Sequence, residues 1–228
     1  MTFNKIKMAI YATFLTNYYG FRLKKALNTQ EKKRLRVEYS KLILDKLNIE
    51  IDIINRDKFP KDGQFLLVSN HRSIIDPLIV ENIAKDSSVY GHWVAKKELY
   101  NSFFFGLFVR NGGTILLDRE SSQMSFFFKE IKECVKAGNS IFIFPEGTRN
   151  KSANVLGEFQ GGAQLIAVKN KLLILPVYIR SNADEILKLA LKNPQNSYKI
   201  EVQIGDIIDY KDRSVPLEEA YKKQFNIS

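Results

Sequence analysis

The chain has 228 residues, 45% hydrophobic and 26% charged, which is typical of one folded domain with at most a small appendage and excludes a disordered tail. Its single cysteine, Cys134, excludes an intramolecular disulfide and a zinc site built on two cysteines. Lys and Arg outnumber Asp and Glu by 35 to 25, and the net charge of +10 indicates an anionic partner: nucleic acid, anionic lipid or a phosphorylated substrate.

Most of the excess positive charge lies at the start of the chain, where residues 1–36 carry nine basic residues and one acidic residue, or +8 of the total +10. Apolar residues spaced mostly by three and four predict a helix over 6–21, and a second helix is predicted over 29–47. The first apolar run is too short and broken for a bilayer span, and it lacks the pattern of a secretory signal. We therefore predict a basic, aromatic-rich helical pair in this part of the chain.

The rest of the chain alternates short apolar runs with amphipathic stretches. Strands are predicted at residues 65–69, 89–95, 114–117, 140–144, 172–179 and 198–204. Helices are predicted at residues 77–84, 98–109, 121–137, 161–169 and 217–225. This alternation predicts an α/β domain over residues 59–228, with a mostly parallel sheet flanked by helices.

Polar residues follow the predicted strand 65–69, and two of them are spaced for general-base chemistry. Four residues separate His71 from Asp76, and Asp76 before Pro77 is typical of a helix start. The loop between them can bring the carboxylate to one imidazole nitrogen and leave the other to remove a proton from a hydroxyl. On its own such a pair more often marks a helix cap beside an ordinary loop histidine.

Two further strand ends carry groups suited to an anionic substrate. Gly147 permits close backbone approach, Thr148 offers a hydroxyl, and Arg149 offers a planar fork for bidentate phosphate binding. Glu146 could bind a substrate hydroxyl or hold an arginine, and Arg119, at another strand end, could supply a second guanidinium. Taken singly, the segment of Glu146 to Arg149 is more typical of a turn with a surface ion pair, and Arg119 could belong to an ordinary ion pair at a strand end.

In their order and spacing, four blocks at residues 70–77, 113–119, 144–149 and 174–177 resemble those of the glycerolipid acyltransferase family, especially the lysophosphatidic acid acyltransferases. The resemblance implies transfer of a fatty acyl group from acyl carrier protein or coenzyme A, the co-substrate, to the free sn-2 hydroxyl of lysophosphatidic acid. The product would be phosphatidic acid, made in phospholipid biosynthesis. Neither a metal nor a cofactor is implied.

On this resemblance His71 is the general base and Asp76 its orienting partner. Residues in the blocks that bind the phosphorylated acceptor are Arg119, Glu146, Gly147, Thr148 and Arg149. Asn70 joins the predicted substrate-binding set because backbone amides near it could stabilise the oxyanion, and Lys97 is either near the acceptor phosphate or on the solvated surface. Gln160 stands where many family members have a lysine, which leaves the acceptor head group open.

For a chain that acts on lipids, the basic amphipathic helical pair then predicts a membrane-association module over residues 1–58, and so a peripheral protein on the cytoplasmic side of the cell membrane. Its expected partners are an anionic membrane surface, the lysophospholipid acceptor and the thioester donor, with no nucleic acid. The pair could instead pack on its own domain with solvated lysines. Alternative functions are acyl transfer to another lysolipid, a non-catalytic membrane adaptor, and nucleic-acid binding, which would leave His71 and Glu146 unexplained.

Overall fold

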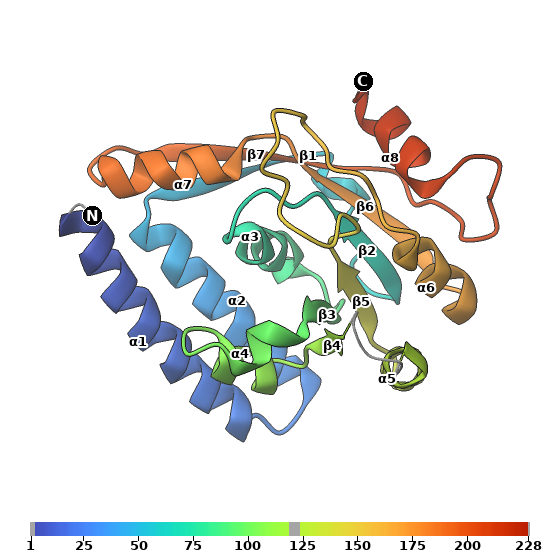
Figure 1. The fold of residues 1–228 in the computed structure, drawn as a ribbon, viewed down its shortest axis with the longest axis horizontal. Coiled ribbons are helices and arrows are strands. Elements are labelled where there is room, and N and C mark those ends of the chain that lie inside the picture. Colours follow the sequence, from blue (N-terminus) through green and yellow to red (C-terminus); the bar gives the residue numbers. More distant parts are fainter. Residues whose placement is uncertain (1–2, 119–123, 228) are drawn as a thin grey trace.

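A seven-stranded sheet runs through the protein in the computed structural model, which describes residues 3–118 and 124–227 (Figure 1). The strand order is β1-β7-β6-β2-β5-β3-β4, and all neighbours are parallel except β6 and β7. The strands are β1 (Ile49–Ile54), β2 (Phe65–Ser69), β3 (Gly91–Lys96), β4 (Ile115–Leu117), β5 (Ser140–Ile143), β6 (Leu173–Ile179) and β7 (Tyr198–Ile204). The predicted mostly parallel α/β fold is confirmed.

Helices cover both faces of the sheet. They are α1 (Phe3–Lys25), α2 (Thr29–Lys46), α3 (Asp76–Ile83), α4 (Gly106–Asn111), α5 (Met124–Lys136), α6 (Gly162–Asn170), α7 (Ala183–Lys192) and α8 (Leu217–Phe225). The apolar core of one face contains side chains of α1, α2, α3 and α7, and that of the other contains side chains of α5, α6 and α8 (Figure 1). Strand β2 serves both, because Phe65 and Leu67 point to the first core while Leu66 and Val68 point to the second.

Each strand expected from the sequence is present, with ends shifted by at most two residues, but some elements differ. The helix predicted over 98–109 is instead the 3-10 helix η3 (Lys97–Asn101) followed by α4, because the Ser102 hydroxyl accepts the N–H groups of Phe104 and Phe105 and turns the chain. Strand β1, which lies within the predicted 1–58 module, and helix α7 were not expected. Of the helix predicted over 121–137, residues 121–123 lie outside the described part.

Two of the basic residues near the start of the chain are buried. Lys33 of α2 donates to the carbonyl oxygens of Ser87 and Val89, and burial lowers the pKa of its ammonium group. Arg36, one turn further along α2, forms a buried ion pair with Glu81 of α3. These cations therefore hold α2 against the domain, and the positive charge of the surface is smaller than the sequence count indicates.

Gly91 offers a test of how tightly the sheet packs on its core. A Cβ atom at Gly91 would lie 2.1 Å from a ring carbon of Phe142, whose side chain is buried between layers. We expect Gly91→Ala to lower the free energy of unfolding by about 1–3 kcal/mol, the usual cost of overpacking, in urea denaturation. Gly162→Ala is the control, because a Cβ there meets nothing within 4 Å and should leave the midpoint unchanged or raised. An unchanged midpoint for Gly91→Ala would contradict this packing.

Candidate active site

His71 and Asp76 form a hydrogen-bonded pair at the carboxyl end of β2. Strand β2 ends two residues before His71, and α3 begins at Asp76, so the short loop between them sets their approach. His71 Nδ1 lies 2.8 Å from Asp76 Oδ2, which also accepts the backbone N–H groups of Arg72 and Ser73 at 2.7 Å each. Asp76 is 1% exposed while the His71 side chain keeps 18%, so the imidazole can meet a substrate and the carboxylate behind it is shielded. The predicted proximity of this pair is present in the structure.

An aromatic stack packs against one face of the His71 imidazole. The ring of Phe144, directly after β5, lies parallel to the His71 ring with 4.1 Å between centroids. Trp93 of β3 stacks on Phe144 in turn, with 4.9 Å between centroids. Sequence reasoning placed Trp93 in its strand but did not identify this stack, since nothing in the local pattern shows that the two strand ends meet.

Glu146 joins the loop of His71 to the loop that follows β5. Its Oε1 accepts the backbone N–H of His71 at 2.7 Å, and its Oε2 accepts the N–H of Gly157 at 3.0 Å. The carboxyl is buried, and this desolvation raises its pKa to about 7, although both backbone hydrogen bonds act in the opposite direction. Each carboxyl oxygen of Glu146 thus accepts a backbone hydrogen bond from the protein itself, so that Glu146 braces the loop that carries His71.

The turn after Glu146 borders an open polar hollow. Gly147 has a φ of 67°, a conformation that favours glycine, and its N–H donates to the Phe144 carbonyl. The hollow has a volume of about 320 Å³. Its lining residues are Glu146, Thr148, Arg149, Asn150, Lys151, Ser152, Gly157, Glu158 and Gln160. Arg149 and Thr148, both predicted to bind the acceptor, therefore share one recess with Gln160.

Three other predicted residues have different surroundings. Asn70 is buried, and its side-chain amide exchanges two hydrogen bonds with the backbone of Ile179 at 2.8 and 3.0 Å, which ties the end of β2 to the end of β6. Lys97 is exposed and pairs with Asp118 at 2.8 Å. Arg119 lies outside the described residues.

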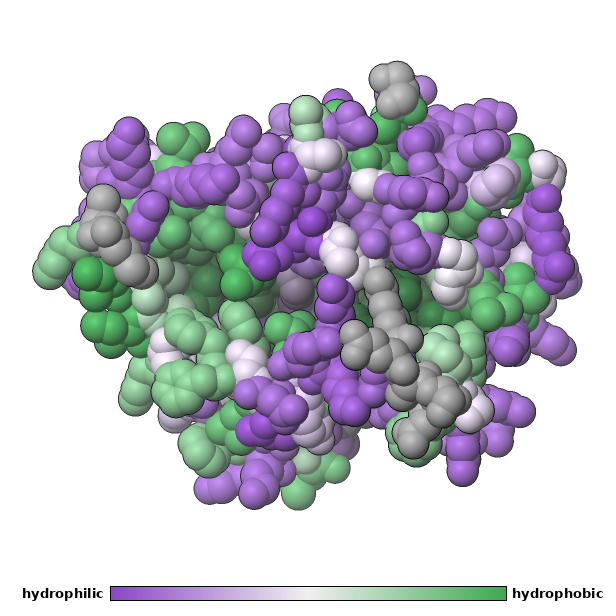
Figure 2. All heavy atoms as spheres, in the orientation of Figure 1, coloured by the Kyte–Doolittle hydropathy of each residue, from purple (hydrophilic) through white to green (hydrophobic). Residues whose placement is uncertain are grey.

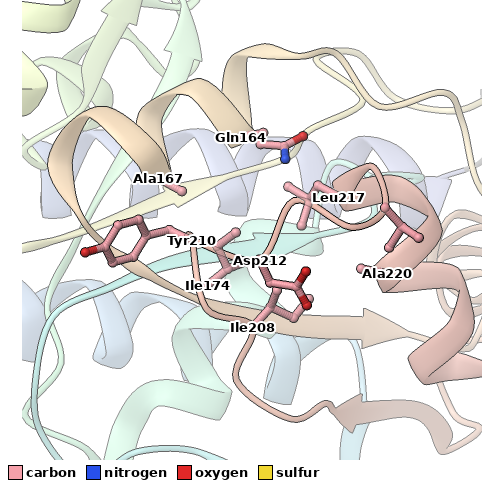
Figure 3. A pocket seen from close by; sticks show the side chains of 9 residues that line it. Gln164, Ala167, Ile174, Ile208, Tyr210, Asp212, Leu217 and Ala220 are labelled. Carbon is pink, nitrogen blue, oxygen red and sulfur yellow. The ribbon is translucent and has the colours of Figure 1, made fainter.

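A second recess, between α6, β6 and α8, contains none of the predicted site residues (Figure 3). Its volume of about 20 Å³ has room for roughly one water molecule. Side chains lining it include Ile174, Ile208 and Leu217. In residues 3–118 and 124–227, no group of three or more His, Cys, Asp or Glu side chains could hold a metal ion.

The mostly parallel sheet thus places the His–Asp pair and the Gly-Thr-Arg turn at the ends of two neighbouring strands, β2 and β5. The profile of the Acyltransferase family matches residues 50–180, and the chain belongs to this family, as the sequence resemblance predicted. It is therefore a member of an enzyme family.

Two bacterial relatives carry the name 1-acyl-sn-glycerol-3-phosphate acyltransferase. The protein from Helicobacter pylori (strain J99) is 31% identical over 170 residues, which are 72% of this chain and 69% of the relative. The protein from Streptococcus pneumoniae (strain R6) is 30% identical over 172 residues, 75% of this chain and 60% of the relative. The crystal structure of the 1-acyl-sn-glycerophosphate (LPA) acyltransferase PlsC from Thermotoga maritima has the same fold, with a TM-score of 0.70 at 23% identity, covering 98% of this chain and 89% of that one.

The raised pKa of Glu146 predicts a pH-dependent contribution to stability. Between its ordinary pKa of 4.5 and about 7, the folded protein keeps a proton on Glu146 that the unfolded chain releases. The contribution of Glu146 to the free energy of unfolding therefore falls as pH rises through this window. We expect the wild type to lose stability relative to Glu146→Gln as the pH rises from about 4.5 to 7.5, measured as the free energy of unfolding in urea.

Glu158→Gln is the matched control, because it removes an exposed carboxyl from the same loop. Its stability should run parallel to that of the wild type over this pH range. Parallel curves for Glu146→Gln as well would contradict a raised pKa for Glu146.

Proposed function

We propose that this protein transfers a fatty acyl group from an acyl thioester to the sn-2 hydroxyl of lysophosphatidic acid, and so produces phosphatidic acid. The observation that carries the proposal is the 2.8 Å bond between His71 Nδ1 and buried Asp76, beside a hollow bordered by Arg149. The names of the two bacterial relatives support this choice of acceptor.

His71 acts as the general base. Because Asp76 engages Nδ1, the proton of the acceptor hydroxyl goes to Nε2, and the carboxylate stabilises the imidazolium that forms. The acceptor oxygen then bonds to the thioester carbonyl carbon and gives a tetrahedral oxyanion. When this intermediate collapses, the C–S bond breaks, the thiolate leaves with the proton returned by His71, and the ester remains. Neither a covalent acyl-enzyme nor a metal is needed for this sequence.

The hollow beside His71 is the proposed place for the phosphate of the acceptor. The backbone N–H of Asn150 donates to the His71 carbonyl at 2.7 Å, so the turn that carries Arg149 is fixed to the catalytic loop. A guanidinium held in this way can bind a phosphate with two hydrogen bonds and place the hydroxyl near the imidazole. Gln160 in the same recess contributes no charge, so the activity assay should also include a lysolipid with a different head group.

Substitution of His71 tests the chemistry. We expect His71→Ala to lower acceptor-dependent thiol release by about 100-fold to 10,000-fold, the usual contribution of a positioned general base. The assay supplies lysophosphatidic acid with acyl-coenzyme A or acyl carrier protein thioester, and so also identifies the donor.

His92→Gln is the control, because burial lowers the pKa of His92 to about 4 and its ring lies on β3. A folded His92→Gln protein should keep its activity. Retention of acceptor-dependent release by His71→Ala would contradict His71 as the base, and its absence from wild type with both donors and both acceptors would contradict the proposed function.

Membrane association through α1 is the second part of this proposal. In the part of the chain that the structure describes, no helix is both long and apolar enough to cross a membrane. The side of α1 that faces away from the core nevertheless presents large apolar side chains to solvent, namely Phe3, Ile6, Ile10, Phe14, Tyr18 and Phe21. Figure 2 shows apolar surface over the part of the molecule where α1 lies. With the exposed lysines Lys7, Lys24 and Lys25 beside it, this stripe suits an anionic lipid surface, proposed to be the cytoplasmic side of the cell membrane.

Point substitutions in this stripe test membrane binding better than deletion of the helical pair, because α2 is part of the core. Burial of one Phe side chain contributes about 1.5–3 kcal/mol, so the double variant Phe14→Ser, Phe21→Ser should bind anionic vesicles at least 100-fold more weakly in co-sedimentation. The matched control is Leu165→Ser, Ile207→Ser, which removes two exposed apolar side chains outside α1 and should bind like wild type. Equal binding by both double variants would contradict the role of α1.

A further inference from the structure

The catalytic imidazole is one end of a stack of three aromatic rings. The rings of His71 and Phe144 are nearly parallel, with 10° between their planes, and those of Phe144 and Trp93 are inclined by 26°. The edge of Phe142 meets Trp93 at 82°, with 5.4 Å between centroids. Phe144 is therefore held between His71 and an indole that the sheet itself supports.

A buried polar network fixes the indole. Trp93 Nε1 donates to Glu81 Oε1 at 2.7 Å, and the same oxygen accepts Arg36 Nε at 3.0 Å. The Arg36 guanidinium also donates to the carbonyl oxygens of Gly91 at 2.9 Å and Gly112 at 3.1 Å. Both Arg36 and Glu81 are buried. The orientation of Trp93 is thus set by α2, α3 and the backbone of its own strand.

We propose that Trp93 is a positioning residue for His71, which it orients through Phe144. The inference rests on the proposed role of His71 as the base. Asp76 holds the imidazole at Nδ1, but a single hydrogen bond leaves the ring free to tilt about that contact. The stack removes this freedom, because a tilted imidazole would lose its contact with Phe144, and Phe144 cannot follow while Trp93 is fixed by Glu81. A displacement of about 1 Å at a reacting atom can cost roughly 100-fold in rate, so this restraint matters for catalysis.

Three variants separate positioning from ordinary packing. Trp93→Leu removes both the stacked ring and the hydrogen bond to Glu81, whereas Trp93→Phe keeps a ring beside Phe144 and loses only the donor. Tyr198→Leu is the matched control, because Tyr198 is also a partly buried aromatic residue of the sheet whose polar group donates to backbone oxygens, here those of Leu189 and Asn193.

Steady-state kinetics of the full chain give the first measurement. We expect Trp93→Leu to lower kcat about 10-fold and to change KM for the acceptor by less than about 2-fold, because binding of the head group does not involve the stack. Trp93→Phe should recover a substantial part of the lost kcat. Tyr198→Leu should keep both constants near those of wild type. A fall in kcat that Tyr198→Leu shares, or a change in KM alone, would overturn the proposal.

Histidine NMR gives a second measurement that needs no substrate. The chain contains two histidines, His71 and His92, so ring-labelled histidine gives two sets of signals, which His71→Ala assigns. We expect Trp93→Leu to shift or broaden the His71 ring signal, because the ring current of Phe144 acts on a reoriented imidazole, and Tyr198→Leu to leave it unchanged. An unchanged His71 signal in Trp93→Leu would overturn the proposal.

The two measurements also distinguish this proposal from the proposed function. If wild type transfers no acyl group, the proposed function fails, whereas the NMR comparison still decides whether Trp93 orients His71. If Trp93→Leu does not fold, Trp93→Phe carries the same comparison, with a smaller displacement of the His71 signal expected and its absence counting against the proposal.

Discussion

The buried ion pair between Arg36 and Glu81 holds together parts of the chain that are far apart in sequence. Removal of two charges from water is costly, and the pair is tolerated because Glu81 also accepts a bond from Trp93 while Arg36 reaches two backbone carbonyls. The helix α2, the helix α3 and the strand β3 are consequently fixed relative to one another. Since α3 begins at Asp76, the same network helps to define the position of the carboxylate proposed to orient His71.

The adjacency of β2 and β5 supplies the second constraint. Parallel neighbours end at the same edge of a sheet, so the loops that carry His71 and Glu146 emerge side by side. Glu146 and the N–H of Asn150 then connect the two loops through the backbone of His71. The His–Asp pair and the hollow beside Arg149 thus lie at one edge of the sheet and are joined by hydrogen bonds, an arrangement that suits acyl transfer between two bound substrates.

Sequence reasoning succeeded where the determining interactions are short in range. His71 and Asp76 are five positions apart with a helix start at Asp76, so their pairing follows from local geometry. The bracing role of Glu146 and the burial of Arg36 depend on partners 75 and 45 positions away, which no local pattern specifies. Strand β1 was missed because its alternation of Ile49, Ile51 and Ile53 with acidic residues follows a helix closely. Helix α7 was missed although the sequence carries local signals for it, with Asn182 as its cap and acidic residues in its first turn.

The site retains polar groups whose burial works against stability. Among the described residues, Asp76 Oδ1 is buried without a hydrogen-bond partner, and Glu146 carries a carboxyl that desolvation keeps close to protonation at neutral pH. An unsatisfied buried acceptor lowers the free energy of unfolding, so packing elsewhere has to compensate for it. The Asp76 carboxylate lies directly behind the imidazole, where, in the proposed mechanism, it favours the imidazolium that forms when the acceptor hydroxyl loses its proton. In the proposed mechanism, burial of the Asp76 carboxylate thus costs stability and at the same time suits this edge of the sheet to general-base chemistry.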